Sequence, residues 1–246
     1  MDDENLEQDG KQELGDVLFS WKRRFDNFWY HYKVPFIFGV LILGFLIFCI
    51  AQCSFRTKGD ANMGYIGGQN ISSEHYENIR NALKDMLGED LNGDGKVHVE
   101  FTGFFYMTSV QVENARARGN PVDVLSLNTV WTQINLELED GNIILYFIDP
   151  EVYKELSNIK GTFMPLEDSL GYIPDDAYDS FTLRLGNLQC WDYYEGLNDL
   201  PSNTLIAVRD LKVSEEDNKQ IKEKYERNLI MLKRLVDFKY LKDDID

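Results

Sequence analysis

The sequence predicts an α/β protein: a largely parallel sheet with helices on both faces, in three α/β/α layers, preceded by a single transmembrane helix. An uncharged run of 22 residues, 34–55, lies near the start of the chain. After it, strand-like apolar runs alternate three times with amphipathic helical patterns, which is typical of a parallel sheet. One of these runs, 143–148, is continuously apolar, as a strand covered on both faces should be.

The composition is that of a globular protein with an acidic surface. Of 246 residues, 43% are hydrophobic and 27% are charged, and the formal charge is −17. Nucleic-acid binding requires clustered Lys and Arg that release counterions, so we expect no nucleic-acid partner. Three Cys and three His are too few for a disulfide scaffold or for most zinc chemistries.

The apolar run divides the chain into four parts. We expect an acidic cytoplasmic tail at 1–20, a basic and aromatic juxtamembrane segment at 21–33, the transmembrane helix at 34–55, and one extracytoplasmic α/β domain at 59–246. At about 1.5 Å per residue the helix reaches ~33 Å, enough for a hydrocarbon core of about 30 Å. A buried core helix is the alternative, but such helices usually carry a polar stripe, and this run has none.

The charges beside the span predict its orientation. Four Lys and Arg side chains precede it within 22–33, and Arg56 and Lys58 follow it. Positive flanks stay in the cytoplasm, so we expect a single-pass plasma-membrane protein with its N-terminus inside and its C-terminal domain outside. The apolar run starts too late for a usual cleaved signal peptide. Cys53 partly matches a bacterial lipoprotein site, and lipidation there is the alternative to a plain anchor.

The first half of the outer domain contains strand-to-helix steps. Residues 63–68 are expected to form a strand, and the helix after them begins with the cap chemistry of Ser72. Alternation of apolar and polar residues over 97–106 predicts a second strand. Pro121, in the first turn, and Gly141, at the end, bound the second helix.

The second half is less regular. After the apolar run, Asp-Pro-Glu at 149–151 is expected to cap a third helix. Residues 162–204 carry aromatic and turn residues without a clear period, so we expect irregular structure with one hairpin. Residues 205–208 predict another buried strand, and 214–217 are expected to open a long terminal helix.

The sharpest local motif is the loop 90–97, which has the oxygen spacing of a calcium loop. Calcium takes six to eight oxygen ligands. The candidate ligands are the side chains of Asp90, Asn92 and Asp94 and the backbone carbonyl of Lys96. The loop resembles the first half of an EF-hand, but Phe101 stands where the last acid is needed. Helix, loop and strand in this order are similar to the calcium loop of some periplasmic sugar-binding proteins, whose last carboxylate comes from elsewhere in the chain. The alternative is a plain turn, in which Asn, Asp and Gly make local hydrogen bonds.

A second candidate site follows the first predicted strand. Its residues are Gly67, Gly68, Gln69 and Asn70. They precede a helix N-terminus, where backbone N–H groups and partial positive charge favour anions. The alternative is that the glycines allow a tight turn. The aromatic residues of 191–194 suit stacking on a sugar ring, with packing in the core or at its rim as the alternative.

Several segments together resemble a known class of protein. They are 63–67 after a single span, the calcium-like loop, the helix ending at Gly141, and the segments 143–156 and 163–166. They are similar to the membrane-tethered solute-binding-protein-like domains of Gram-positive bacteria, of the type II periplasmic-binding class, over about 62–215. The resemblance implies a ligand crevice at the carboxyl ends of the strands, with Asp149 beside the glycine turn. The chain suffices for one lobe, whereas a two-lobed binding protein needs roughly twice the sequence.

These features predict a non-enzymatic binding or interaction module, anchored in the lipid bilayer and stabilised by calcium. Its ligand is expected to be a small solute or an envelope protein. No GxSxG, HExxH or Walker sequence occurs, and His75 and His98 are the only histidines after the span. The alternative is an envelope-polymer hydrolase, which needs two carboxyl groups about 5 to 10 Å apart in a concave site.

Overall fold

A computed structural model of the chain describes residues 25, 28–49 and 59–240, which belong to two separate compact units. The predicted acidic tail, the basic residues at 22–24 and Cys53 lie outside the described residues. Each unit is described by itself.

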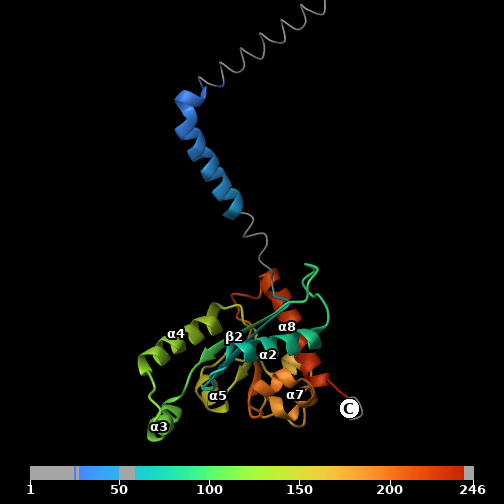
Figure 1. The fold of residues 1–246 in the computed structure, drawn as a ribbon. Helices are drawn as coiled ribbons and strands as arrows, with labels where there is room; N and C mark the ends of the chain where they lie inside the picture. The colour runs from blue at the N-terminus through green and yellow to red at the C-terminus, as the bar shows by residue number, and fades with distance from the viewer. Residues whose placement is uncertain (1–24, 26–27, 50–58, 241–246) are drawn as a thin grey trace, which may run out of the picture. The chain divides into compact units, whose positions relative to one another are not determined.

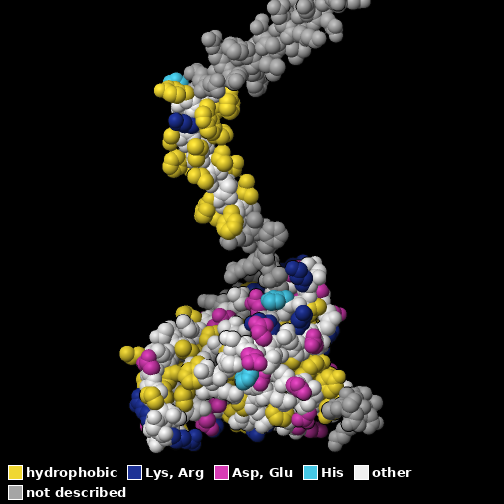
Figure 2. All heavy atoms as spheres, viewed as in Figure 1, with side chains coloured by type: hydrophobic (Ala, Val, Ile, Leu, Met, Phe, Trp, Pro, Cys, Tyr) yellow, Lys and Arg dark blue, Asp and Glu magenta, His cyan; other side chains and the backbone are white. Residues whose placement is uncertain are grey.

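The first unit contains the helix Phe28–Cys49, which is long and apolar enough to cross a membrane. None of its apolar window is buried by other parts of the protein. Figure 2 shows hydrophobic side chains along its visible side. The helix begins before the predicted span, because the aromatic residues of the juxtamembrane segment continue it: Phe28 stacks on Tyr32 one turn later, with ring centroids 5.5 Å apart. Positions 50–55 of the predicted span lie outside the described residues.

The second unit is an α/β domain with a five-stranded sheet in the order β2-β1-β3-β5-β4. The strands are β1 (Ala61–Gly67), β2 (Val99–Phe105), β3 (Leu145–Ile148), β4 (Thr182–Arg184) and β5 (Leu205–Val208). β1 pairs in parallel with β2 and β3, whereas β5 is antiparallel to both β3 and β4. The mixed α/β class and the mostly parallel sheet are confirmed, with β5 as the strand that runs the other way.

Helices cover both faces of this sheet (Figure 1). On one face lie α2 (Ser73–Leu87), α6 (Leu166–Leu170), α7 (Gln189–Tyr193) and α8 (Lys219–Asp237). On the other lie α4 (Val124–Asp140) and α5 (Pro150–Leu156), and α3 (Ser109–Ala117) precedes α4. Side chains alternate along each strand, so Met63 and Tyr65 of β1 enter the first core and Ile66 enters the second.

Two helix starts differ from the prediction, and side-chain caps explain the difference. α4 begins at Val124 because the carboxylate of Asp123 accepts the N–H groups of the first turn, so Pro121 lies before the helix. α8 begins at Lys219 after the cap Asn218. α3 is not predicted by the sequence, since Val112 is its one buried residue and it has no apolar stripe.

The stretch 162–204 is more regular than expected. It contains α6, β4, α7 and two short 3-10 helices, Leu185–Asn187 and Glu195–Asp199. Such elements are too short to show a hydrophobic period. The second 3-10 helix packs against α2: a Cβ at Gly196 would lie 2.3 Å from the Asn78 carbonyl oxygen, so only glycine fits there.

The last helix is bonded to the first strand. The side-chain oxygen of Asn228 accepts the N–H of Asn62 at 3.0 Å, and the Arg227 side chain donates to the Asp60 carbonyl at 3.2 Å. The two ends of the domain sequence are therefore parts of one core.

A buried ion pair links the end of β5 to the segment that precedes α8. The guanidinium of Arg209, 1% exposed, donates to both carboxylate oxygens of Glu215, at 2.9 and 3.2 Å. It also lies 5.5 Å from the ring centroid of Tyr225. Because both ends of the pair are held, the segment between them is fixed against the sheet.

Candidate functional site

The order of the sheet creates a switch point at β1. One connection leaves β1 through α2 to β2, and the next returns through α3 and α4 to β3 on the other side of β1. Ligands of open α/β sheets bind outside the carboxyl ends of the strands at such a point. The structure brings the predicted turn Gly67–Asn70 and Asp149 together at this edge, where the N–H of Asp149 donates to the carbonyl of Ile66 at 2.8 Å.

Several polar side chains at this edge of the sheet already make hydrogen bonds within the protein. One oxygen of Asp149 accepts the N–H of Glu151 at 2.8 Å, as the cap of α5, and the side-chain amide of Gln111 at 3.1 Å. The Gln69 side chain donates to the Asp199 carbonyl at 3.2 Å.

Close packing against a neighbouring side chain explains why Gly67, at the start of the turn, is a glycine. A Cβ at Gly67 would lie 2.3 Å from the hydroxyl oxygen of Tyr65. Burial is the main reason that the pKa of Tyr65 rises to about 12, and the Asp149 carboxylate adds to it. The buried phenol thus occupies the space beside the turn, which favours the tight-turn interpretation of Gly67.

In the predicted calcium loop, the side chains of Asp90, Asn92 and Asp94 each accept backbone N–H groups from residues a few positions later. The two oxygens of Asp90 accept N–H groups from Asn92 (3.1 Å), Gly93 (2.7 Å) and Gly95 (2.6 Å). These bonds, with that of Gly95 the strongest, hold the pKa of Asp90 below its ordinary value. Asn92 and Asp94 accept the N–H groups of Asp94 and Lys96 in the same way, at 2.9 and 3.0 Å.

Asp60 organises this loop, and sequence reasoning missed it. Its side chain is fully buried, and its carboxylate accepts the N–H groups of Leu91 (2.8 Å), Asn92 (2.8 Å) and His98 (2.7 Å). The signal in the sequence is slight: one acid directly before the first apolar strand.

The loop offers fewer oxygen ligands than calcium usually takes. Both Asp60 oxygens are engaged by backbone N–H groups, so this carboxylate does not complete the loop as in the proteins that it resembles. Within residues 25, 28–49 and 59–240, no group of three or more His, Cys, Asp or Glu side chains is placed to hold a metal ion. Two carboxylates, one amide and one carbonyl fall short of the six to eight oxygens that calcium takes. Calcium stabilisation therefore stays a prediction without further structural support.

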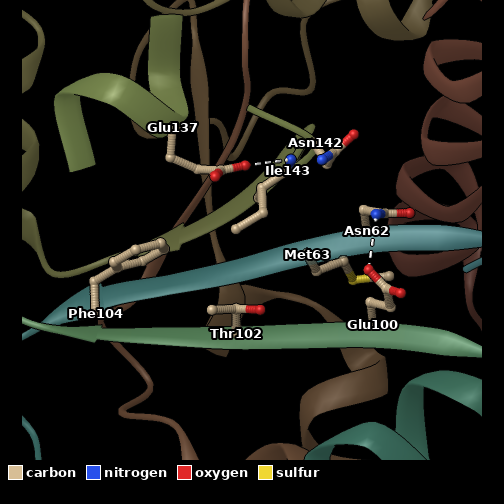
Figure 3. Close-up of a pocket in the computed structure, with 8 residues that line it drawn as sticks. All are labelled: Asn62, Met63, Glu100, Thr102, Phe104, Glu137, Asn142 and Ile143. Atoms are coloured by element: carbon tan, nitrogen blue, oxygen red, sulfur yellow. Dashed lines mark hydrogen bonds between the residues drawn. The ribbon is translucent and has the colours of Figure 1, made fainter. Parts of the chain in front are cut away.

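A pocket of about 200 Å³ opens on the α4 face of the sheet (Figure 3). It is lined by Asn62, Met63, Glu100, Thr102, Phe104, Glu137, Asn142 and Ile143. Glu137 reaches in from α4 and accepts the N–H of Ile143 at 2.9 Å. Glu100 reaches in from β2 and accepts the Asn62 side-chain amide at 3.1 Å. Two carboxylates thus lie in the wall of one partly apolar hollow.

This pocket lies near the amino ends of the strands, away from the predicted crevice. It exists because β2 is an edge strand whose outward residues Glu100 and Thr102 are exposed. In the core on the same face of the sheet, the hydroxyl of Tyr146 is buried and makes no hydrogen bond among the described residues. Burial raises the pKa of Tyr146, and the charge of Glu137 raises it further. The alternation in 97–106 could have indicated Glu100, but nothing in the sequence joins it to Glu137.

The aromatic residues at 191–194 pack against the end of α8. The indole N–H of Trp191 donates to the Leu200 carbonyl at 3.3 Å. The rings of Tyr193 and Tyr194 lie 5.1 and 5.3 Å from that of Phe238. This arrangement favours packing at the core rim over stacking on a sugar.

Comparisons of the chain with protein-family models, with curated proteins and with solved structures found no significant match. The resemblance to a solute-binding lobe therefore stays a prediction.

Proposed function

We propose that the protein is a single-pass, membrane-anchored binding or interaction module whose α/β domain lies outside the plasma membrane. The observation that carries this proposal is the helix Phe28–Cys49, whose apolar window has no protein cover. A helix that is hydrophobic on all sides is stable only where lipid or protein surrounds it.

The energy of insertion supports a membrane anchor. Between Val34 and Phe48 the chain has twelve Val, Ile, Leu and Phe side chains. At about 0.3 to 0.6 kcal/mol each, they favour insertion by about 5 kcal/mol in total. The orientation follows from the basic residues before the span, so the acidic domain is expected outside.

Fractionation and protease accessibility test the anchor and its orientation. The full chain, with a C-terminal epitope, is expected to stay in the membrane pellet after alkaline carbonate washing. Protease added to cells with a permeable wall and an intact membrane should digest the epitope but leave a cytoplasmic marker whole. The double variant Leu41→Arg/Leu43→Arg should leave the pellet, because two Arg cost about 6 kcal/mol at the helix centre and cancel the gain. A wild-type chain in the soluble fraction, or a protected epitope, would refute the proposal.

A binding role fits the domain better than catalysis. The switch-point edge is held together by its own hydrogen bonds, and the pocket in Figure 3 joins apolar and polar side chains from β1, β2 and α4. The lining has three apolar and five polar residues, and small-molecule sites likewise combine apolar surface with polar groups that orient the ligand. A ligand bound in this pocket would be held by a domain that is itself anchored to the membrane.

One observation favours the alternative, an envelope-polymer hydrolase: Glu100 and Glu137 line the same pocket. Paired carboxylates are the catalytic groups of most glycoside hydrolases. The test is incubation of the full chain with purified peptidoglycan. Soluble fragments released by the wild type and absent with Glu137→Gln would favour the hydrolase, whereas no release favours the binding module.

A further inference from the structure

We propose that the pocket of Figure 3 binds a small organic ammonium ion, which pairs with Glu100 and Glu137 while its hydrocarbon part lies along Phe104 and Ile143. This inference rests on the proposed binding function and names the chemical class of its ligand.

The polar groups of the pocket are rich in acceptors. Its lining includes two carboxylates and no Lys or Arg. One oxygen of each carboxylate takes a hydrogen bond from the protein, from the Asn62 amide to Glu100 and from the Ile143 N–H to Glu137. A carboxylate offers about four lone-pair sites, so each retains acceptor capacity toward a donor in the pocket. An ammonium group has three N–H donors and no acceptor, which matches this set.

The protein already places an ammonium group at the rim. Lys224 of α8 donates from its amine to the side-chain oxygen of Asn142, which lines the pocket. Lys224 does not line the pocket, and among the described ion pairs it contacts neither Glu100 nor Glu137, so this amine does not neutralise the two carboxylates. The acidic domain also raises the local concentration of cations, since its charge attracts them.

The size and the apolar lining limit the ligand. At about 30 Å³ per water, the pocket has the volume of about seven waters, and typical drug-sized sites of about 300 to 1,000 Å³ are larger. Phe104 and Ile143 supply apolar side chains beside the carboxylates. The face of a Phe ring also attracts cations. These limits fit an amine with a short hydrocarbon chain.

The test is a calorimetric titration of the full chain in the uncharged detergent dodecyl maltoside. The probe is 1,5-diaminopentane, and 1,5-pentanediol is its neutral analogue of the same length. The variants are Glu100→Gln and Glu137→Gln, which keep an acceptor oxygen for the Asn62 and Ile143 donors. Glu113→Gln, which removes an exposed acid of α3 outside the pocket lining, is the matched control for diffuse charge attraction.

The diamine is expected to bind at least tenfold more tightly than the diol. Glu100→Gln and Glu137→Gln should each weaken it at least fivefold, and Glu113→Gln less than twofold. Equal binding of the diol, an equal loss in Glu113→Gln, or no loss in either pocket variant would overturn the inference. Circular dichroism of each variant shows whether it is folded, and a misfolded variant is replaced by Glu100→Asp or Glu137→Asp, which must shift the affinity. The fractionation and protease experiments test the membrane anchor independently. If they succeed but the diamine does not bind, the ammonium site is rejected and the proposed membrane-anchored module is not.

Discussion

Asp60 and His98 are joined by two hydrogen bonds: the N–H of Asp60 donates to the His98 carbonyl at 2.7 Å, and the N–H of His98 donates to the Asp60 carboxylate at 2.7 Å. The pair extends the contact between β1 and β2 by one residue beyond the paired strands. It also places the buried carboxylate where it can hold the start of the 90–97 loop.

Replacing Asp60 should destabilise the domain. Asp60→Asn keeps the shape but turns a donor toward backbone N–H groups, and each buried N–H left without an acceptor costs about 1 to 3 kcal/mol. We expect a loss of about 2 kcal/mol, or roughly 6 °C in melting temperature for a domain of this size. Thermal unfolding of the full chain in detergent, followed by circular dichroism, measures it. The exposed Asp85→Asn serves as the control, and a shift in Asp60→Asn no larger than in that control would contradict the assignment.

Calcium binding by the 90–97 loop stays a prediction, and calorimetric titration of the wild type with millimolar calcium tests it. Asp60 and the side-chain turns hold the loop without a metal, so no heat of binding would leave the plain turn as the explanation. Heat that disappears in Asp90→Ala and in Asp94→Ala would show instead that the loop is a calcium site.

Removing one member of the buried ion pair should cost more than removing both. Glu215→Ala leaves the Arg209 guanidinium buried without its carboxylate, and breaking such a pair costs about 3 to 5 kcal/mol. Arg209→Met/Glu215→Leu removes both charges and is expected to unfold closer to the wild type. Urea midpoints of the three proteins decide this, and a double variant weaker than Glu215→Ala would disagree with the expected order.

The Asp90 loop should lose stability in acid. Backbone N–H groups, first that of Gly95, lower the pKa of Asp90 in the folded state below 3.8. A lowered folded pKa contributes stability above the unfolded value, and this contribution is lost as the pH falls through the folded pKa. The melting temperature is therefore expected to fall below about pH 4, less steeply in Asp90→Asn. Parallel pH profiles of the two proteins would count against this account.

Cys190 should resist thiol reagents until the domain unfolds. It is fully buried, and burial raises the pKa of its thiol to about 12. At pH 8 the thiolate fraction is then roughly 10⁻⁴, against about a quarter for an ordinary thiol. In a Cys49→Ser/Cys53→Ser background, mass spectrometry after N-ethylmaleimide treatment should show no adduct in the native protein and one adduct in urea. Complete labelling of the native protein within minutes would mean that this helix opens readily.

Much of the fold could be predicted from local patterns. The apolar runs at 63–68 and 143–148 became β1 and β3, and the cap at Ser72 starts α2. The direction of β5 could not be predicted, because its apolar run is the same whichever way it pairs. The start of α3 does carry a signal, the capping box of Thr108 and Gln111, but no apolar stripe follows it, so the helix was missed.

The sites could be predicted only in part. The glycine turn and Asp149 lie together because the carboxyl ends of parallel strands meet at one edge of the sheet. The order of strands and helices in the sequence is enough to predict this. Glu100 and Glu137 line one pocket because α4 packs against β2, and that depends on tertiary packing. Asp60 acts on residues more than 30 positions later, beyond the reach of any spacing rule.

The bond between Asn62 and Asn228, 166 residues apart in the chain, bears on how the protein is made. At about 5 to 20 residues per second, β1 leaves the ribosome roughly 10 to 30 seconds before its partner on α8 exists. The nascent domain must pass this interval without the helix that bonds to β1, so a chaperone or the translocation machinery has time to hold it. Chains terminated before α8 are expected to be degraded, because they never acquire the helix that covers β1.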